Sequence, residues 1–168
     1  MEADVAVRPV GGGQERERCA ALMAASEPWR TLGRSFEASL AIMSDPSREV
    51  YWVEKAGQWA GFLVLYMDGP FRGYIQTVCL RDECRGRGVG SAVVRWAEER
   101  IFRESPNVFM CVSDFNTGAR RLYLRMGYEV IGSLADFLVE GHAELLLRKS
   151  RGPWSTFRPT MPPEDTPG

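Results

Sequence analysis

The stretch that decides the fold reads Val78-Cys-Leu-Arg-Asp-Glu-Cys-Arg-Gly-Arg-Gly-Val-Gly-Ser91. A strand-like apolar run ends in it, glycines at positions 86, 88 and 90 follow, and an amphipathic helical pattern begins behind them. Closely spaced glycines let the backbone approach a ligand and point successive N–H groups in one direction. The helix start adds the positive end of a dipole, and Arg85 and Arg87 add full charges. The stretch therefore predicts a loop that binds a phosphate group.

Two common phosphate-binding motifs do not describe this loop. A Walker loop requires a lysine directly after its glycines, and none follows them here. The dinucleotide fingerprint Gly-x-Gly-x-x-Gly would place Ser91 at its third glycine. Taken alone, the loop therefore leaves open another kind of phosphate site, a nucleotide site, or a tight turn with solvated arginines.

Composition limits the classes of function. A chain of 168 residues with 45% hydrophobic and 26% charged residues is typical of one globular domain. A net charge of −1 creates no general attraction for nucleic acid or an anionic membrane. No apolar run approaches the roughly 20 residues of a membrane span, and the first residues lack the pattern of a signal peptide. We therefore expect a cytoplasmic protein whose partners include neither nucleic acid nor membrane.

Cysteine and histidine usage argues against a metal site. The four cysteines, at positions 19, 79, 84 and 111, form no Cys-x-x-Cys pair. The single histidine, His142, lies in a predicted turn, where a surface role is the simpler interpretation. The sequence thus predicts no metal, and neither a serine–histidine–aspartate triad nor a histidine-based centre.

The hydrophobic patterns predict an α/β protein with a mixed sheet. A strand–helix–strand unit in the middle of the chain implies a parallel pair of strands within this sheet. We predict one domain over residues 1–151, followed by a proline-rich tail over residues 152–168. The predicted strands are 4–10, 49–55, 59–67, 74–80, 108–112, 128–139 and 143–149, and the predicted helices are 14–25, 34–43, 88–102 and 116–126.

Two motifs resemble those of the GNAT superfamily of acyl-CoA-dependent N-acetyltransferases. Arg85-Gly-Arg-Gly-Val-Gly90 is similar to the family's Arg/Gln-x-x-Gly-x-Gly/Ala loop. Asn116-Thr-Gly-Ala-Arg-Arg-Leu-Tyr-Leu-Arg-Met-Gly-Tyr128 is similar to its Asn-x-x-Ala-x-x-Leu-Tyr-x-x-x-Gly-Phe/Tyr helix. The well-matched part covers about residues 74–130, and within the superfamily the chain is similar to the branch that acetylates the N termini of ribosomal proteins. The resemblance implies the order β-α-α-β-β-β-α-β-α-β-β, with a V-shaped opening between the fourth and fifth strands.

The resemblance also implies a site for acetyl-CoA, used as a co-substrate without a metal. The pantetheine arm would lie in the opening and pair with backbone groups of the fourth strand, and the diphosphate would lie on the N–H groups of the glycine-rich loop. The residues implied in cofactor binding are Val78, Cys79, Leu80, Arg85, Gly86, Arg87, Gly88, Val89, Gly90, Ser91, Asn116 and Tyr123.

Acetyl transfer to an amine requires a neutral amine, a polarised thioester carbonyl and a proton for the leaving thiolate. By resemblance, Tyr123 is the general acid that protonates the thiolate, although it also lies on the apolar stripe of its helix. A backbone N–H near Val78–Leu80 would polarise the carbonyl. In relatives that acetylate protein N termini, a glutamate on the 108–112 strand is the base, and this chain has Cys111 there. The base is therefore open, with Glu49, Glu54, Tyr74, Gln76 and Asp114 as candidates, and Cys111 as a less favoured acyl-accepting nucleophile.

The acceptor side is less determined. Trp29, Arg30, Phe71, Arg72, Phe137 and His142 are candidates to line it, although the aromatic residues could equally pack in the core. Glu140 and Glu144 could attract a cationic amine, and Arg30 with Arg72 could attract a carboxylate.

The predicted function is direct transfer of the acetyl group of acetyl-CoA to a primary amine of a peptide, protein or small molecule; the alternative is a non-catalytic acyl-CoA-binding module. An exposed edge strand or a swapped hairpin would allow a homodimer.

Overall fold

The computed structural model describes residues 4–160. Its elements follow the predicted order of strands and helices, with two short 3-10 turns in addition. The bounds are β1 Val5–Pro9, α1 Gly13–Ala25, α2 Phe36–Ser44, β2 Arg48–Lys55, β3 Gln58–Tyr66, β4 Tyr74–Leu80, η1 Asp82–Cys84, α3 Val89–Ile101, β5 Asn107–Ser113, α4 Thr117–Arg125, β6 Glu129–Ala135, β7 Ala143–Ser150 and η2 Trp154–Thr156.

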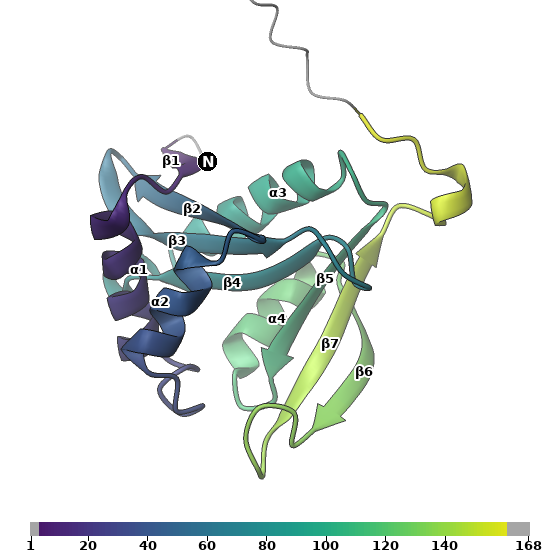
Figure 1. The fold of residues 1–168 in the computed structure, drawn as a ribbon. Coiled ribbons are helices and arrows are strands. Elements are labelled where there is room, and N and C mark those ends of the chain that lie inside the picture. The colour runs from purple at the N-terminus through teal and green to yellow at the C-terminus, as the bar shows by residue number, and fades with distance from the viewer. Residues whose placement is uncertain (1–3, 161–168) are drawn as a thin grey trace, which may run out of the picture.

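The seven strands form one mixed sheet in the order β1-β2-β3-β4-β5-β7-β6. Every neighbouring pair is antiparallel except β4 and β5, which the α3 crossover makes parallel. Helices α1 and α2 cover one face, and α3 and α4 cover the other (Figure 1). The mixed α/β fold predicted from the sequence is therefore confirmed, and both faces of the central strands are buried.

Local sequence explains the two helices that flank the site. Helix α3 buries Val89, Val93, Ala97 and Ile101 at helical spacing, so one apolar stripe attaches it to the sheet. Helix α4 begins at Asn116, whose side-chain oxygen accepts a hydrogen bond from the backbone N–H of Ala119 at 3.4 Å. The predicted capping role of Asn116 is thus confirmed.

The opening predicted between the fourth and fifth strands is present. Strands β4 and β5 pair only at Tyr74 with Phe109 and at Ile75 with Met110. At this closed end the N–H of Phe109 donates to the carbonyl of Gly73 at 2.9 Å. Beyond Ile75, the described parts of the two strands diverge, and their facing edges form no ladder.

A β-bulge bends β4 where the opening begins. Val64 pairs with Thr77 and Leu65 pairs with Ile75, so Gln76 is an extra residue in β4. The Gln76 side-chain oxygen accepts a hydrogen bond from Nε of Arg48 at 2.5 Å. The bulge turns the strand away from β5 and contributes to the V shape.

The hairpin near the C-terminus differs from the sequence-based expectation. Strand β6 ends at Ala135, not at residue 139, because Asp136 adopts a left-handed backbone with φ of 52°. The Asp136 carboxylate accepts the N–H of Gly141 at 2.7 Å, which closes a wider loop than a simple turn. Leucine and phenylalanine side chains in this loop are therefore displayed at the surface and do not continue the sheet.

The start of the predicted tail lies on the domain. Trp154 packs edge-to-face on Phe157, and the N–H of Thr160 donates to the carbonyl of Arg103 at 2.9 Å. The remainder of the predicted tail, residues 161–168, falls outside the described residues. Within the described part of the chain, none of the helices combines the length and the apolar character needed to cross a membrane.

Candidate active site

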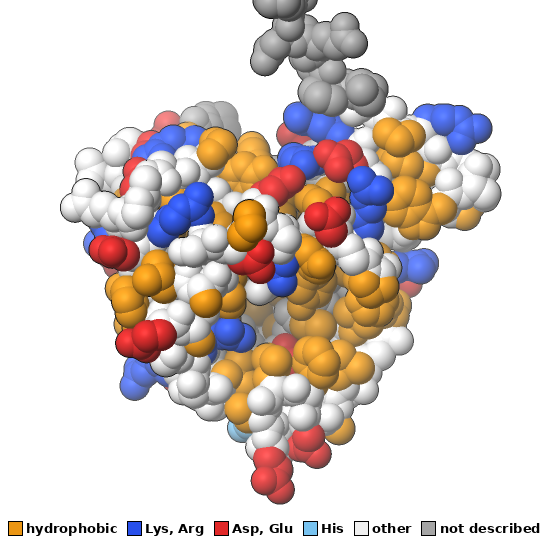
Figure 2. Space-filling view, viewed as in Figure 1, with side chains coloured by type: hydrophobic (Ala, Val, Ile, Leu, Met, Phe, Trp, Pro, Cys, Tyr) orange, Lys and Arg blue, Asp and Glu red, His pale blue; other side chains and the backbone are white. Residues whose placement is uncertain are grey.

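A cavity of about 1280 Å³ passes through the opening between β4 and β5. Figure 2 shows its mouth as a hollow bordered by hydrophobic side chains, in the middle of the face that α2 covers in part. The walls come mainly from β4, β5, β7, α4 and the start of α3, and from the segments that connect these and neighbouring elements. A cavity of this size has room for an extended cofactor together with a second ligand.

One end of the cavity, which we call the loop half, is formed by Arg85, Gly86, Gly88, Gly90 and Ser91. Gly86 and Gly88 have φ values of 67° and 78°, which glycine adopts without strain. A Cβ atom at either position would meet nothing within 4 Å, so these glycines are required by backbone conformation and not by packing. The first N–H groups of α3 follow directly and have no partners within the helix, as an anion site needs.

The facing edges of β4 and β5 supply the next part of the cavity. Residues Gln76–Leu80 of β4 form no ladder with β5, and β5 uses its other edge to pair with β7. Val78, Leu80 and Val112 line the cavity along these edges. Backbone groups are therefore free to pair with the amides of an extended ligand, as with an added strand.

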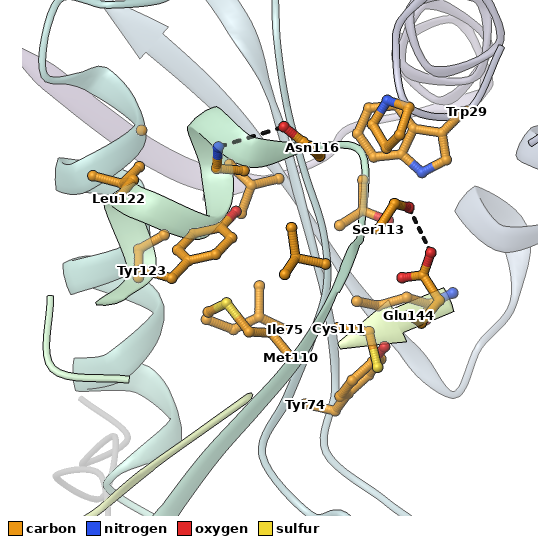
Figure 3. A pocket seen from close by; sticks show the side chains of 18 of the residues that line it. Trp29, Tyr74, Ile75, Met110, Cys111, Ser113, Asn116, Leu122, Tyr123 and Glu144 are labelled. Atoms are coloured by element: carbon orange, nitrogen blue, oxygen red, sulfur yellow. Dashed lines mark hydrogen bonds between the residues drawn. The ribbon is translucent and has the colours of Figure 1, made fainter. Parts of the chain in front are cut away.

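Tyr123 projects from α4 into the cavity, on the side opposite Glu144 (Figure 3). Its ring meets the Tyr128 ring edge-on, with 6.1 Å between the centroids. Burial raises the pKa of the Tyr123 phenol to about 12. The hydroxyl is therefore protonated at neutral pH and can donate a proton or a hydrogen bond.

The other end, which we call the acceptor half, is formed by side chains from distant segments. Trp29 comes from the connection between α1 and α2, and Phe71 from the connection between β3 and β4. Phe137 and Leu138 come from the β6–β7 loop, and Glu144 comes from β7. This half is mostly apolar, with a single carboxylate among the six side chains Trp29, Phe71, Cys111, Phe137, Leu138 and Glu144.

Glu144 is buried at the wall of this half, with 5% of its surface exposed. Its Oε1 accepts a hydrogen bond from Oγ of Ser113 at 2.5 Å, across the pairing of β5 and β7. Burial raises the pKa of the Glu144 carboxyl; the charge of Asp114 adds to the rise and the Ser113 hydrogen bond opposes it. A carboxylate with a raised pKa can accept a proton more readily than an ordinary glutamate.

Cys111 and Tyr74 lie beside Glu144 (Figure 3). Burial raises the pKa of the Cys111 thiol, and the hydrogen bond with Tyr74 only partly opposes this. Burial also raises the pKa of Tyr74, with further contributions from Cys111 and Glu144. The thiol is neutral at physiological pH, which is the opposite of an activated nucleophile.

The structure brings together most of the residues that the resemblance implied in cofactor binding. Cys79 and Val89 are exceptions, because their side chains are buried in the core, and Arg87 does not reach the cavity. Backbone roles for these three residues stay predictions. Those that line the cavity are Val78, Leu80, Arg85, Gly86, Gly88, Gly90, Ser91, Asn116 and Tyr123.

Three candidate bases lie outside the cavity and have structural partners. Glu49 pairs with Arg100 at 2.5 Å, and Glu54 lies 3.5 Å from Arg8. Asp114 accepts the N–H of Ala143 at 3.0 Å and lies 3.3 Å from His142, so it organises the start of β7. Tyr74 and Gln76, the other two candidates, do line the cavity.

The sequence suggests Glu144 as an attractor for an amine but does not identify it as a base. The signal was a glutamate followed by three leucines in the run Ala143-Glu-Leu-Leu-Leu147, where an acid interrupts an apolar strand. Its alternative, Glu140, is exposed and does not line the cavity. Burial separates these two glutamates, and only the fold determines burial.

The remaining acceptor candidates divide in the same way. Trp29, Phe71 and Phe137 line the cavity, whereas Arg30, Arg72 and His142 do not. Arg72 lies 3.5 Å from Glu104, so the proposed arginine pair is not assembled at the site. Among residues 4–160 there is no cluster of three or more side chains suited to holding a metal ion.

Comparisons with known proteins agree with this geometry. The model of the Acetyltransferase (GNAT) family matches residues 16–128. An uncharacterised N-acetyltransferase of Methanocaldococcus jannaschii is 31% identical over 107 residues, a match that spans 60% of this chain and 65% of the relative. A structure from Desulfovibrio desulfuricans, described as an acetyltransferase of the GNAT family, superposes with a TM-score of 0.69 at 14% identity, covering 87% of this chain and 98% of that one.

A further solved structure is an aminoglycoside 6'-N-acetyltransferase in complex with coenzyme A. It superposes with a TM-score of 0.67 at 13% identity and covers 88% of this chain and 98% of that one. At this identity the likeness concerns the fold alone. Because the family model matches more than half of the sequence, and the fold and opening agree with it, the chain belongs to the acetyltransferase (GNAT) family.

Proposed function

We propose that this protein transfers the acetyl group of acetyl-CoA directly to a primary amine. The observation that carries the proposal is the opening between β4 and β5, which joins the glycine-rich loop half to the acceptor half in one cavity. Tyr123 reaches into this cavity from α4. A cofactor entering along the loop half would place its reactive end between the two halves.

Each part of acetyl-CoA has a matching surface in this proposal. The diphosphate lies on the N–H groups of the glycine-rich loop and the first turn of α3. The pantetheine amides pair with the free edge of β4 at Gln76–Leu80. A backbone N–H on this edge also stabilises the negative charge that develops on the thioester oxygen.

The transfer itself needs no covalent intermediate on the protein. The neutral amine attacks the thioester carbonyl carbon, the C–N bond forms and the C–S bond breaks. Tyr123 gives its proton to the departing sulfur, because its phenol is protonated at neutral pH. The neutral state of the Cys111 thiol favours this direct route over acyl transfer through Cys111.

Replacing Tyr123 with phenylalanine tests the proton donor. We expect kcat to fall by about 10- to 100-fold, since general acid catalysis contributes at least that much, while acetyl-CoA still binds. Tyr128→Phe is the matched control, because it removes a buried phenol that does not line the cavity. Full turnover by Tyr123→Phe would contradict the assignment. Acetyl-CoA binding without thiol release, for a broad panel of amines, would instead indicate a non-catalytic acyl-CoA-binding module.

The resemblance to enzymes that acetylate N termini of ribosomal proteins extends the proposal to peptide acceptors. A peptide N terminus and a small amine would both reach the acceptor half through its open mouth. The same proposal places the protein in the cytoplasm, where acetyl-CoA and such acceptors occur together. A homodimer would use β6, which is an edge strand with exposed Val130 and Ile131.

A further inference from the structure

Two glutamates are buried in the described part of the chain, and their partners differ. Glu98, with 7% of its surface exposed, pairs with Nζ of Lys149 at 2.9 Å. Glu144 is buried to the same degree, but no cation among residues 4–160 forms an ion pair with it. A buried carboxylate without a cation is costly, because the single hydrogen bond from Ser113 replaces only part of the hydration that burial removes. Since Glu144 also lines the cavity, a ligand bound there can place a positive charge beside it.

The groups that surround Glu144 reinforce its preference for a cation. Tyr74 faces it from β4, and Cys111 and Ser113 face it from β5; all three are neutral at physiological pH. Asp114 adds a negative charge at the end of β5. None of these groups offsets the carboxylate charge. An ammonium group bound there is therefore attracted by the whole charge of the Glu144 carboxylate.

Four arginines line the cavity, Arg34, Arg48, Arg85 and Arg125, and among the described residues none of them forms an ion pair with Glu144. Arg48 is held by Gln76 and lies over the Tyr66 ring, with 3.8 Å from the guanidinium carbon to the ring centroid. Arg34 belongs to the connection between α1 and α2 and forms no ion pair with Glu144. Glu144 is the buried carboxylate of the cavity wall, whereas Glu27 and Asp68, which also line the cavity, are exposed to solvent.

The mouth of the acceptor half displays large apolar side chains to solvent. Phe71, Phe137 and Leu138 are 47%, 59% and 46% exposed, and each lines the cavity. They come from two separate connections, and Phe71 is braced by the Phe109 ring at 5.1 Å. Exposed apolar side chains gathered at the rim of a cavity are typical of a surface that contacts an apolar ligand.

We infer that the acceptor is a primary amine with one positive charge on an apolar body of aromatic size, and that Glu144 binds its ammonium group and takes its proton. The inference rests on the proposed function and names the acceptor class for that site. The apolar body lies against Phe71, Phe137 and Leu138, while the ammonium group points inward to Glu144. Ser113 positions the carboxylate through its hydrogen bond.

Protons balance in this scheme. Glu144 takes one proton from the ammonium ion, and the resulting neutral amine attacks the thioester carbon. When the C–S bond breaks, Tyr123 gives its proton to sulfur and recovers one from the nitrogen of the new amide. Glu144 then releases its proton to solvent, so each turnover yields an amide, CoA thiol and one free proton. The raised pKa of Glu144 supports its role as acceptor of that first proton.

The first test replaces Glu144 with glutamine. We expect kcat/KM for 2-phenylethylamine to fall by at least about 100-fold, with no change in the dissociation constant of acetyl-CoA. The melting temperature should not fall, because glutamine keeps a partner for Ser113 and removes a charge that burial disfavours. Glu140→Gln is the matched control, an exposed carboxylate near the same strand. Unchanged kcat/KM in Glu144→Gln would overturn the assignment of the base.

The second test compares acceptors. We expect 2-phenylethylamine to be used with at least about tenfold higher kcat/KM than 1,5-diaminopentane or a lysine-containing peptide. The diamine would place a second charge at the apolar mouth, and the peptide would place a polar backbone there. Phe137→Ala should reduce this ratio, whereas Ile131→Ala, at an exposed apolar residue outside the cavity, should leave it unchanged. Equal or better use of the diamine or peptide would overturn the acceptor class while leaving the proposed function intact.

Failure of the proposed function gives a different result. Neither binding of acetyl-CoA nor thiol release with any of the three acceptors would then be observed. That outcome would also remove the basis of the inference. Binding of acetyl-CoA together with turnover of only the diamine or the lysine-containing peptide would contradict the inference alone.

Discussion

The loop half and the acceptor half of the cavity are built in opposite ways. The loop half comes from one continuous segment, Arg85–Ser91, and offers backbone N–H groups held by left-handed glycines. The acceptor half offers side chains from β7, three connecting segments and the facing strands. The two halves therefore depend to different degrees on the identity of their side chains. Binding through backbone N–H groups tolerates substitution of most side chains, whereas binding through side chains changes with each substitution at the site.

The largest effect is expected from a substitution that disrupts the paired end of β4 and β5, which holds both halves in place. Gly73 closes the β4–β5 pair with φ of 91°, and a Cβ there would lie 2.4 Å from the carbonyl oxygen of Asn107. Gly73→Val should therefore lower the free energy of unfolding by about 3 kcal/mol or more, measured by urea denaturation. Gly132→Ala is the control, since a Cβ there meets nothing within 4 Å. An equal loss in both variants would contradict the role of the closed end.

The pH dependence of turnover separates the two halves. Protonation of Glu144 removes the base, and its pKa is raised above the ordinary 4.5. The acidic limb of kcat/KM should therefore have its midpoint above pH 4.5, and turnover should be lost as the pH falls through that midpoint. Glu144→Gln should lose this limb and keep its affinity for acetyl-CoA across the same range. A limb retained in the variant would assign the titration to another group.

A substitution in the glycine-rich loop should affect the cofactor alone. Gly88 adopts φ of 78° at the N-terminus of α3, with open space where a side chain would lie. Gly88→Val introduces backbone strain of roughly 1–2 kcal/mol, which displaces the N–H groups of the first turn. We expect KM for acetyl-CoA to rise by about tenfold with KM for the amine unchanged. Gly13→Ala, at an open position in α1, should change neither constant.

The smallest effect concerns an ion pair outside both halves. The hydrogen bond from Arg8 lowers the pKa of Glu15 to about 2, with help from the Gly11 N–H. Because the folded pKa lies below the unfolded value, this stabilisation is present above pH 4.5 and is lost as the pH falls toward 2. Both side chains are partly exposed, so Glu15→Gln should cost less than about 1 kcal/mol at pH 7. Urea denaturation at pH 7 and near pH 2 measures it, and a cost that persists near pH 2 would contradict the ionic origin.

The regular elements could be predicted because their patterns are local. Helix α3 has its apolar stripe, α4 has its Asn116 cap, and the order of strands and helices follows from alternation and turn residues. The predicted end of β6 at residue 139 was wrong. Asp136 turns the chain through a left-handed conformation, and the apolar residues that follow it resemble a continuing strand in the sequence. The 3-10 turn at Asp82–Cys84 was also absent from the prediction, since only a single turn of backbone defines it.

The sequence alone determined the parts of this protein that short-range patterns encode. Glycine spacing, the apolar stripe of α3 and the cap of α4 indicate the loop half, because these features depend on residues within one or two turns of each other. The tertiary structure decided the rest. It buried Glu144 and exposed Glu140, kept Asp114 outside the cavity and brought Trp29, Phe71 and Phe137 to one mouth. Burial and proximity across distant segments arise only when the sheet assembles, and they set both the charge and the shape that an acceptor amine meets.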